Sequence, residues 1–120
     1  MKKILLVDDD LSILDLISEK LKSLGFGVRA AICGNEAIEI LQDEIFDLVI
    51  SDFRMPDGNG MLVLEHVNKM NNPPAFFFLS AQADMSIEEC LKAGAKKFML
   101  KPVDLNKIVH EIESIKKLRP

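Results

Sequence analysis

Three short runs of consecutive apolar residues constrain the fold of this chain more than any other feature of its sequence. They lie at residues 4–7, 48–50 and 75–79. A strand with one face in water alternates apolar and polar residues, whereas a strand covered on both faces is apolar throughout. We therefore expect these runs to be inner strands of a sheet that has helices on both sides.

Helical patterns separate these runs. Apolar residues at three- and four-residue spacing predict helices over residues 11–24, 60–70 and 105–118. Two shorter helices are expected, one opened by Gly34-Asn35 and carrying Ala37, Ile38 and Leu41, the other over about residues 86–93. The first helix should bury the stripe Leu14, Ile17, Leu21 and Leu24.

Further strands complete the alternation. Residues 26–31 alternate at Phe26, Val28 and Ala30, which is typical of an edge strand, and residues 97–100 form a last short strand. The third strand should extend over residues 46–51. Alternating strands and helices with short connections predict an α/β fold: a flavodoxin-like, doubly wound, five-stranded parallel sheet of order 2-1-3-4-5 with five helices. Residues 1–120 are expected to form one domain.

Composition narrows the classes of function. The net charge of −4 argues against direct binding to nucleic acid, which needs clustered positive charge. Cys33 and Cys90 are isolated, as expected of reduced thiols in a cytosolic protein. No stretch is long enough to cross a membrane, so we expect a cytoplasmic location and no membrane partner.

Polar residues stand where four of the five predicted strands end. Asp8 and Asp9 follow the first strand, Asp52 the third, Ser80 the fourth and Lys101 the fifth. The carboxyl ends of parallel strands lie at one edge, beside the crevice where the strand order reverses. A functional site is therefore predicted at this edge.

The charges at this edge indicate what the site binds. Carboxylates about 4 Å apart repel by roughly 4 kcal/mol at an effective dielectric near 20, so three of them require neutralisation. Lys101 supplies one positive charge, and Mg²⁺, which prefers oxygen ligands, would supply two more. The absence of His and Cys from the strand ends argues against zinc and copper. A carboxylate, a metal, a lysine and a hydroxyl are the groups that phosphoryl transfer requires.

Five motifs carry a resemblance to a known family. They are Ile4-Leu5-Leu6-Val7-Asp8-Asp9-Asp10, Ser51-Asp52-Phe53-Arg54-Met55-Pro56, Gly60, Phe78-Leu79-Ser80-Ala81 and Lys101-Pro102. In this order, and over the whole chain, they resemble the receiver domain of two-component response regulators. The departures are mild: Ser80 stands where threonine is commoner, and Phe98 where tyrosine is.

The resemblance implies a role for each site residue. Asp52 would accept a phosphoryl group from a histidine kinase or phosphotransfer protein. Mg²⁺ would be bound by Asp8, Asp9, Asp52 and the backbone carbonyl of Arg54, and Lys101 and Ser80 would hold phosphoryl oxygens. The peptide bond Lys101-Pro102 would be cis. The chain would catalyse only its own phosphorylation and dephosphorylation, and would not be an enzyme otherwise.

The same resemblance implies a switch. Ser80 and Phe98 would move when Asp52 is phosphorylated. The surface formed by the helix near residues 86–93, the strand 97–100 and the helix 105–118 would then change its preference for a downstream effector or a second copy of the chain.

Simpler interpretations stay open for several of these residues. Asp52 could merely cap a turn, and Phe98 could be only a core residue. Asp10 and Asp104 are expected to cap helices, Gly25 to end one, and Asp57 to serve a turn. His66 and His110 are expected on the surface.

Two other classes of function fit the sequence less well. An aspartyl-phosphate hydrolase for small molecules would share the acids and the lysine, but 120 residues leave no room for a cap over a substrate. A flavodoxin-like electron carrier is disfavoured because the chain has no Trp or Tyr to stack on a flavin, and because its first loop is acidic.

Overall fold

Five parallel strands form one sheet in the order β2-β1-β3-β4-β5 in the computed structural model. The structure describes residues 2–81 and 87–118, and it describes side chains as far as residue 115. The strands are β1 Lys3–Val7, β2 Gly27–Ala31, β3 Leu48–Asp52, β4 Ala75–Ser80 and β5 Lys97–Leu100. The helices are α1 Leu11–Ser23, α2 Gly34–Asp43, α3 Gly60–Asn68, α4 Ile87–Lys92 and α5 Leu105–Leu118. The predicted architecture and strand order are confirmed.

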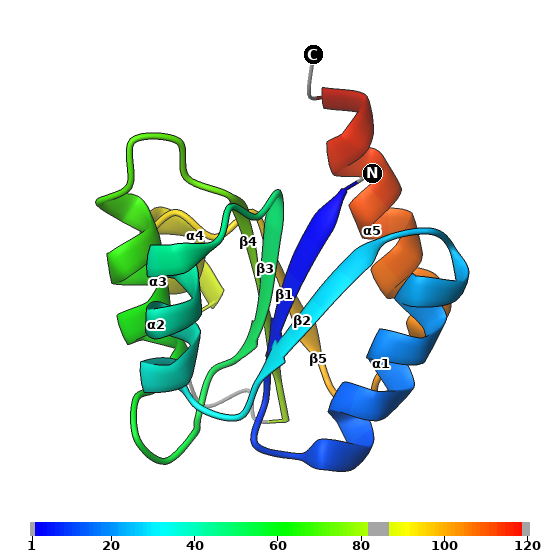
Figure 1. Ribbon diagram of the computed structural model, residues 1–120, viewed down its shortest axis with the longest axis horizontal. Coiled ribbons are helices and arrows are strands. Elements are labelled where there is room, and N and C mark those ends of the chain that lie inside the picture. Colours follow the sequence, from blue (N-terminus) through cyan, green and yellow to red (C-terminus); the bar gives the residue numbers. More distant parts are fainter. Residues whose placement is uncertain (1, 82–86, 119–120) are drawn as a thin grey trace.

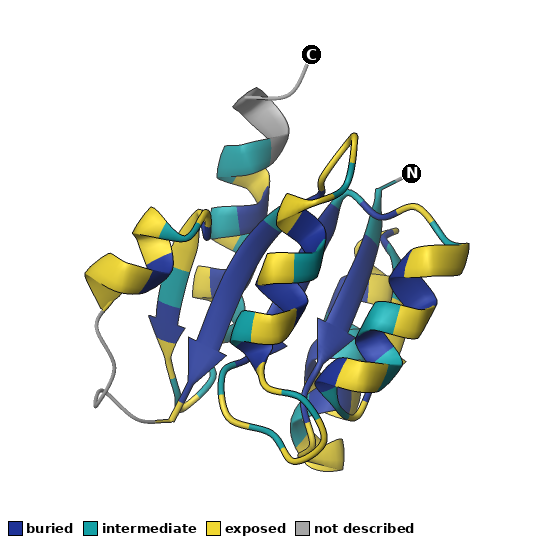
Figure 2. Ribbon diagram, turned by 90° about the vertical axis from the view of Figure 1, so that its left-hand side faces the viewer, coloured by how far each residue is buried: buried dark blue, intermediate teal, exposed yellow. Residues whose placement is uncertain are grey.

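Helices cover both faces of the sheet, with α1 and α5 on one side and α2, α3 and α4 on the other (Figure 1). Successive side chains of a strand point to opposite faces. Leu5 and Val7 of β1 accordingly join the core beneath α2 and α3, whereas Ile4 and Leu6 join the core beneath α1 and α5. The inner strands are buried along their length (Figure 2), which explains their continuous apolar runs.

The strand β2 lies at the edge of the sheet, as its weaker pattern predicted. The predicted alternation is nevertheless wrong at the end of the strand. Ala30 is exposed and Ala31 is buried, because Ala31 packs into the core that also contains Ala37 and Leu41 of α2.

The first helix begins and ends with the expected capping residues. The Asp10 carboxylate accepts hydrogen bonds from the backbone N–H groups of Ser12 (3.0 Å) and Ile13 (3.4 Å). Gly25 follows the helix at φ 93°, a left-handed conformation that glycine adopts without steric cost. The expected burial of Leu24 was wrong: its side chain is 48% exposed, because α1 ends at Ser23 and the chain turns there.

Other differences concern element ends. The strand β3 begins at Leu48 and includes Asp52, and α3 ends at Asn68. The inner face of α2 is formed by Ala37, Ile40 and Leu41, with Ile38 only partly buried. Asp104 caps α5 as predicted, accepting a hydrogen bond from the Lys107 N–H (3.2 Å). The predicted start of the fourth helix at residue 86 lies outside the described residues.

All five strands end at the same edge of the sheet, which is the lower edge in Figure 1. The order reverses between β1 and β3, whose carboxyl ends are adjacent there. Among the helices of the described residues, none combines the length and the apolar character needed to cross a membrane.

Candidate functional site

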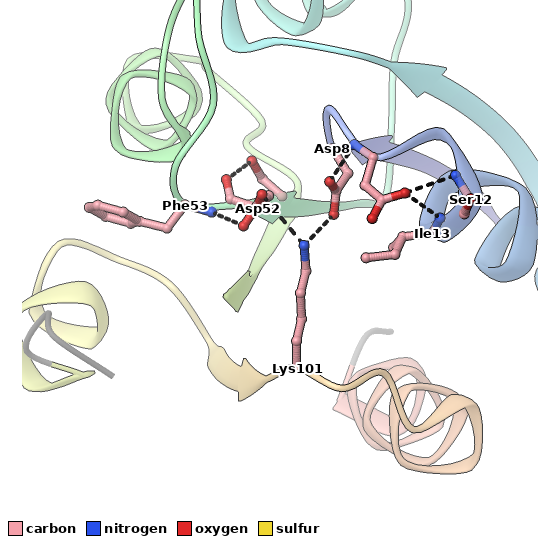
Figure 3. Close-up of polar contacts among 8 residues, drawn as sticks. Asp8, Ser12, Ile13, Asp52, Phe53 and Lys101 are labelled. Carbon is pink, nitrogen blue, oxygen red and sulfur yellow. Dashed lines mark hydrogen bonds and ion pairs between the residues drawn. The ribbon is translucent and has the colours of Figure 1, made fainter. Parts of the chain in front are cut away.

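The side chain of Lys101 joins two carboxylates at the carboxyl edge of the sheet (Figure 3). Its Nζ lies 2.9 Å from Asp8 Oδ2 and 3.5 Å from Asp52 Oδ2. Asp8 follows β1, Asp52 ends β3, and Lys101 follows β5, so the topology brings together residues from three separate parts of the sequence. Both carboxylates are buried, and the lysine side chain is 13% exposed.

Asp52 is oriented by its own backbone. One carboxylate oxygen, Oδ1, accepts a hydrogen bond from the Phe53 N–H (2.9 Å), and the other faces Lys101. Asp8 is held similarly, because its Oδ1 accepts from the Asp10 N–H (2.9 Å). Each acid therefore presents its second oxygen to the space around the lysine.

The acids of this site outnumber its lysine, so negative charge is in excess. Burial, together with the nearby charge of Asp8, raises the pKa of Asp52 from 3.8 to about 6, although Lys101 and the Phe53 N–H oppose the shift. For Lys101, burial alone would lower the pKa, but its contacts with Asp8 and Asp52 outweigh burial and raise it. The lysine is therefore fully charged at neutral pH, and one ammonium group does not offset the carboxylates around it.

A third acid completes a group that fits a divalent cation. Asp8, Asp9 and Asp52 each offer a carboxylate oxygen, and these oxygens lie within 4.8 Å of one another. Asp9 is exposed, so the group is open to solvent on its side. Three carboxylates beside one lysine leave an excess of two negative charges, and their oxygens are the ligands that Mg²⁺ prefers. The residues present therefore fit this metal.

Ser80 lies on β4 and Phe98 on β5, the two strands that follow β3 in the sheet. Ser80 ends β4 and is buried, and its backbone carbonyl accepts a hydrogen bond from the Lys101 N–H (2.8 Å). The Lys101-Pro102 peptide bond is cis, as expected. Phe98 of β5 is partly buried, and its ring centroid lies 6.2 Å from that of Phe78.

The loop between β3 and α3 carries Arg54 and is attached to a neighbouring helix. The Gly34 N–H donates to the Gly58 carbonyl (2.9 Å), and the Asn35 N–H donates to the Asp57 carbonyl (3.1 Å). Asp57 has the left-handed φ of 55°, in keeping with its predicted turn. This attachment to Gly34 could not be predicted, because no local sequence pattern reports a contact between segments that are distant in sequence.

The chain is similar to known proteins both in sequence and in structure. Residues 4–113 match the family described as the response regulator receiver domain. The chain is 34% identical over 113 residues to the transcriptional regulatory protein ZraR of Salmonella typhimurium. The aligned region covers 92% of this chain and 25% of that protein. It thus spans about a quarter of the length of this relative.

Solved structures agree with the sequence match. The receiver domain of HemR from Leptospira biflexa, in its non-phosphorylated form, superimposes with a TM-score of 0.88 at 34% identity, covering 100% of this chain and 98% of that one. The response regulator TrrA of Thermotoga maritima, crystallised in complex with Mg²⁺-BeF, gives a TM-score of 0.85 at 27% identity and covers 95% of this chain and 98% of that one. With a family match over most of its length, the chain belongs to the response regulator receiver domains.

Proposed function

We propose that this chain is a phosphorylation-driven switch in which Asp52 accepts a phosphoryl group from a histidine kinase or phosphotransfer protein. One observation carries the proposal. A buried carboxylate lies 3.5 Å from a lysine ammonium, within a group of three acids that could share one cation. Phosphoryl transfer depends mainly on positioning and on neutralising the oxygens of the transferred group, and these residues supply both.

The proposal gives each side chain of the site a role in the reaction. An oxygen of Asp52 attacks the phosphorus, the bond from phosphorus to the donor histidine nitrogen breaks, and an aspartyl-phosphate remains. Asp8 and Asp9, with the Arg54 carbonyl, would hold Mg²⁺, which when bound neutralises phosphoryl oxygens. Lys101 holds another of these oxygens with its ammonium. TrrA, which shares the fold, binds Mg²⁺-BeF, and this supports the assignment of the metal.

Phosphorylation would change the surface beside β5. The phosphoryl group adds about −1.5 to −2 charges, which attract the Ser80 hydroxyl toward Asp52. Phe98 then occupies the space that Ser80 leaves, and the surface of α4, β5 and α5 changes its affinity for a downstream effector or a second copy of the chain. We expect this switch to act in the cytoplasm, without direct contact with nucleic acid or membrane, and to turn over no substrate other than its own phosphoryl group.

Labelling with a small phosphodonor tests the proposal. The chain is incubated with acetyl phosphate and MgCl₂, and intact mass is measured for the parent, Asp52→Asn and Asp57→Asn. We expect one acid-stable, base-labile phosphoryl group on the parent and on Asp57→Asn, whose exposed acid lies in the adjacent loop. Asp52→Asn should remain unlabelled. Equal labelling of Asp52→Asn and the parent would reject Asp52 as the acceptor.

A further inference from the structure

We infer that Gly34, which belongs to α2 and has no side chain, is a positioning residue for the metal site. The inference rests on the proposed function, because it takes the Arg54 carbonyl as a ligand of Mg²⁺. Gly34 would act through the loop of residues 53–59 that connects β3 to α3.

The beginning of α2 depends on this loop for its hydrogen bonds. The first N–H groups of a helix have no partner within the helix, and a side chain usually caps them. Cys33, at the N-cap position of α2, makes no such hydrogen bond. The carbonyls of Asp57 and Gly58 accept from the N–H groups of Asn35 and Gly34 instead, so the loop caps the helix with its backbone.

The two backbones approach too closely for any side chain at position 34. A Cβ atom on Gly34 would lie 2.4 Å from the Gly58 carbonyl oxygen and 2.7 Å from its carbon. Both atoms belong to the backbone, so an added methyl group could be accommodated only by moving the loop or the helix. Gly58 itself has φ +103°, which an L-residue rarely adopts.

The loop cannot absorb that movement at its other end. The Gly60 N–H donates to the Phe53 carbonyl (2.8 Å), and the Phe53 N–H donates to Asp52 Oδ1 (2.9 Å). A Cβ on Gly60 would lie 2.4 Å from the Asp52 carbonyl oxygen, so the loop is closely packed there too. Displacement at Gly58 must therefore be taken up between these two attachments, where Arg54 lies.

The expected consequence is selective. Asp8, Asp9 and Asp52 stand at strand ends and keep their positions, while the Arg54 carbonyl moves. Changes to groups that orient metal ligands typically weaken metal binding by 10- to 100-fold. We expect Gly34→Ala to raise the Kd for Mg²⁺ roughly tenfold.

Magnesium titration with a matched glycine variant tests this. MgCl₂ is titrated into the ¹⁵N-labelled parent, Gly34→Ala and Gly25→Ala, and Kd is taken from amide chemical shifts. Gly25 also has a positive φ, but a Cβ there would meet nothing within 4 Å, so Gly25→Ala adds backbone strain away from the loop. Its Kd should equal that of the parent even where its Tm falls.

A second measurement separates positioning from general damage. The rate of labelling by acetyl phosphate is followed against the concentration of MgCl₂. Gly34→Ala should require roughly tenfold more Mg²⁺ for half-maximal rate, yet reach the parent's rate at saturation. If Gly34→Ala does not fold, Gly58→Ala tests the same contact from the loop side, where a Cβ would lie 3.0 Å from the Asn35 nitrogen.

Different outcomes would reject the role of Gly34 and the proposed metal site. A parental Kd in Gly34→Ala, or a lower maximal rate with unchanged Kd, overturns the role of Gly34 alone. If Asp52→Asn binds Mg²⁺ as tightly as the parent does, the proposed metal site is wrong, and the inference about Gly34 is wrong with it.

Discussion

Two groups of charged side chains in this molecule have opposite charge balance. Beside the amino end of β1, Lys3 and Arg29 surround one acid, Glu44, at 2.5 and 3.2 Å. At the carboxyl ends of the strands, one lysine stands among three acids. In the first group two cations pair with a single acid near the surface, whereas in the second a single, largely buried lysine is outnumbered by its acids.

The difference appears in the acids themselves. The hydrogen bond from Lys3 lowers the pKa of Glu44, whereas burial and Asp8 raise the pKa of Asp52 to about 6. An acid that is stabilised in its charged form needs nothing further. An acid that is destabilised in its charged form would be stabilised by a nearby cation, which is what the proposed function requires at Asp52.

Replacing the lysine in each group should give the largest difference between the two groups. Lys101→Met should lower the rate of labelling by acetyl phosphate on the order of a hundredfold, because an ammonium that neutralises developing charge is lost. Lys3→Met should leave the rate unchanged. The rates are measured by intact mass at saturating MgCl₂, with circular dichroism to verify folding. Similar rates for the two variants would remove the functional distinction between the groups.

Asp52→Asn should stabilise the protein in the absence of Mg²⁺. The folded pKa of Asp52, about 6, exceeds the ordinary value of 3.8, so the folded state binds more protons between these values and loses stability as pH rises through them. Above pH 6 the variant escapes this loss, by about 2 kcal/mol after allowance for solvent access. Urea unfolding at pH 4 and pH 8 measures it. A variant less stable than the parent at pH 8 would contradict the attribution of the raised pKa to burial and to the charge of Asp8.

Magnesium should stabilise the parent through the carboxyl edge alone. At ten times its Kd, a ligand that binds only the folded state contributes ~1.4 kcal/mol. Thermal unfolding with MgCl₂, and with KCl at matched ionic strength, should show this gain for the parent and for Glu44→Gln. Asp52→Asn should lose most of it. A loss in Glu44→Gln as well would locate binding away from the strand ends.

Glu44→Gln should have the smallest effect, with the opposite sign to Asp52→Asn. The pKa of Glu44 is lowered in the folded protein, so its contribution to stability is present above the ordinary value of 4.5 and is lost as pH falls through the lowered folded value. The variant should be slightly less stable than the parent at pH 7 and equal to it at low pH, as measured by urea unfolding. The ion pair between Lys3 and Glu44 is partly exposed to solvent. A large loss of stability at pH 7 would therefore show that this pair contributes more than a surface ion pair usually does.

The sequence by itself determined the architecture and most of the site. Continuous apolar runs identified the inner strands, and parallel strands necessarily end at one edge, so Asp8, Asp52 and Lys101 could be expected to meet there. The errors lay where an element ends or a strand changes its buried face, as at Leu24 and Ala31. Burial at such positions depends on where the chain turns, which local periodicity does not report.

Only the tertiary structure decided which charges are satisfied and which contacts are close. Glu44 and Asp52 are both acids beside lysines in the folded protein, but burial and the count of neighbouring charges shift their pKa values in opposite directions. The contact of Gly34 with Gly58 joins segments 24 residues apart (58 minus 34), and no local pattern specifies it. The physical reason is that periodicity records which face of an element is buried, whereas desolvation and close approach depend on what the rest of the chain brings against that face.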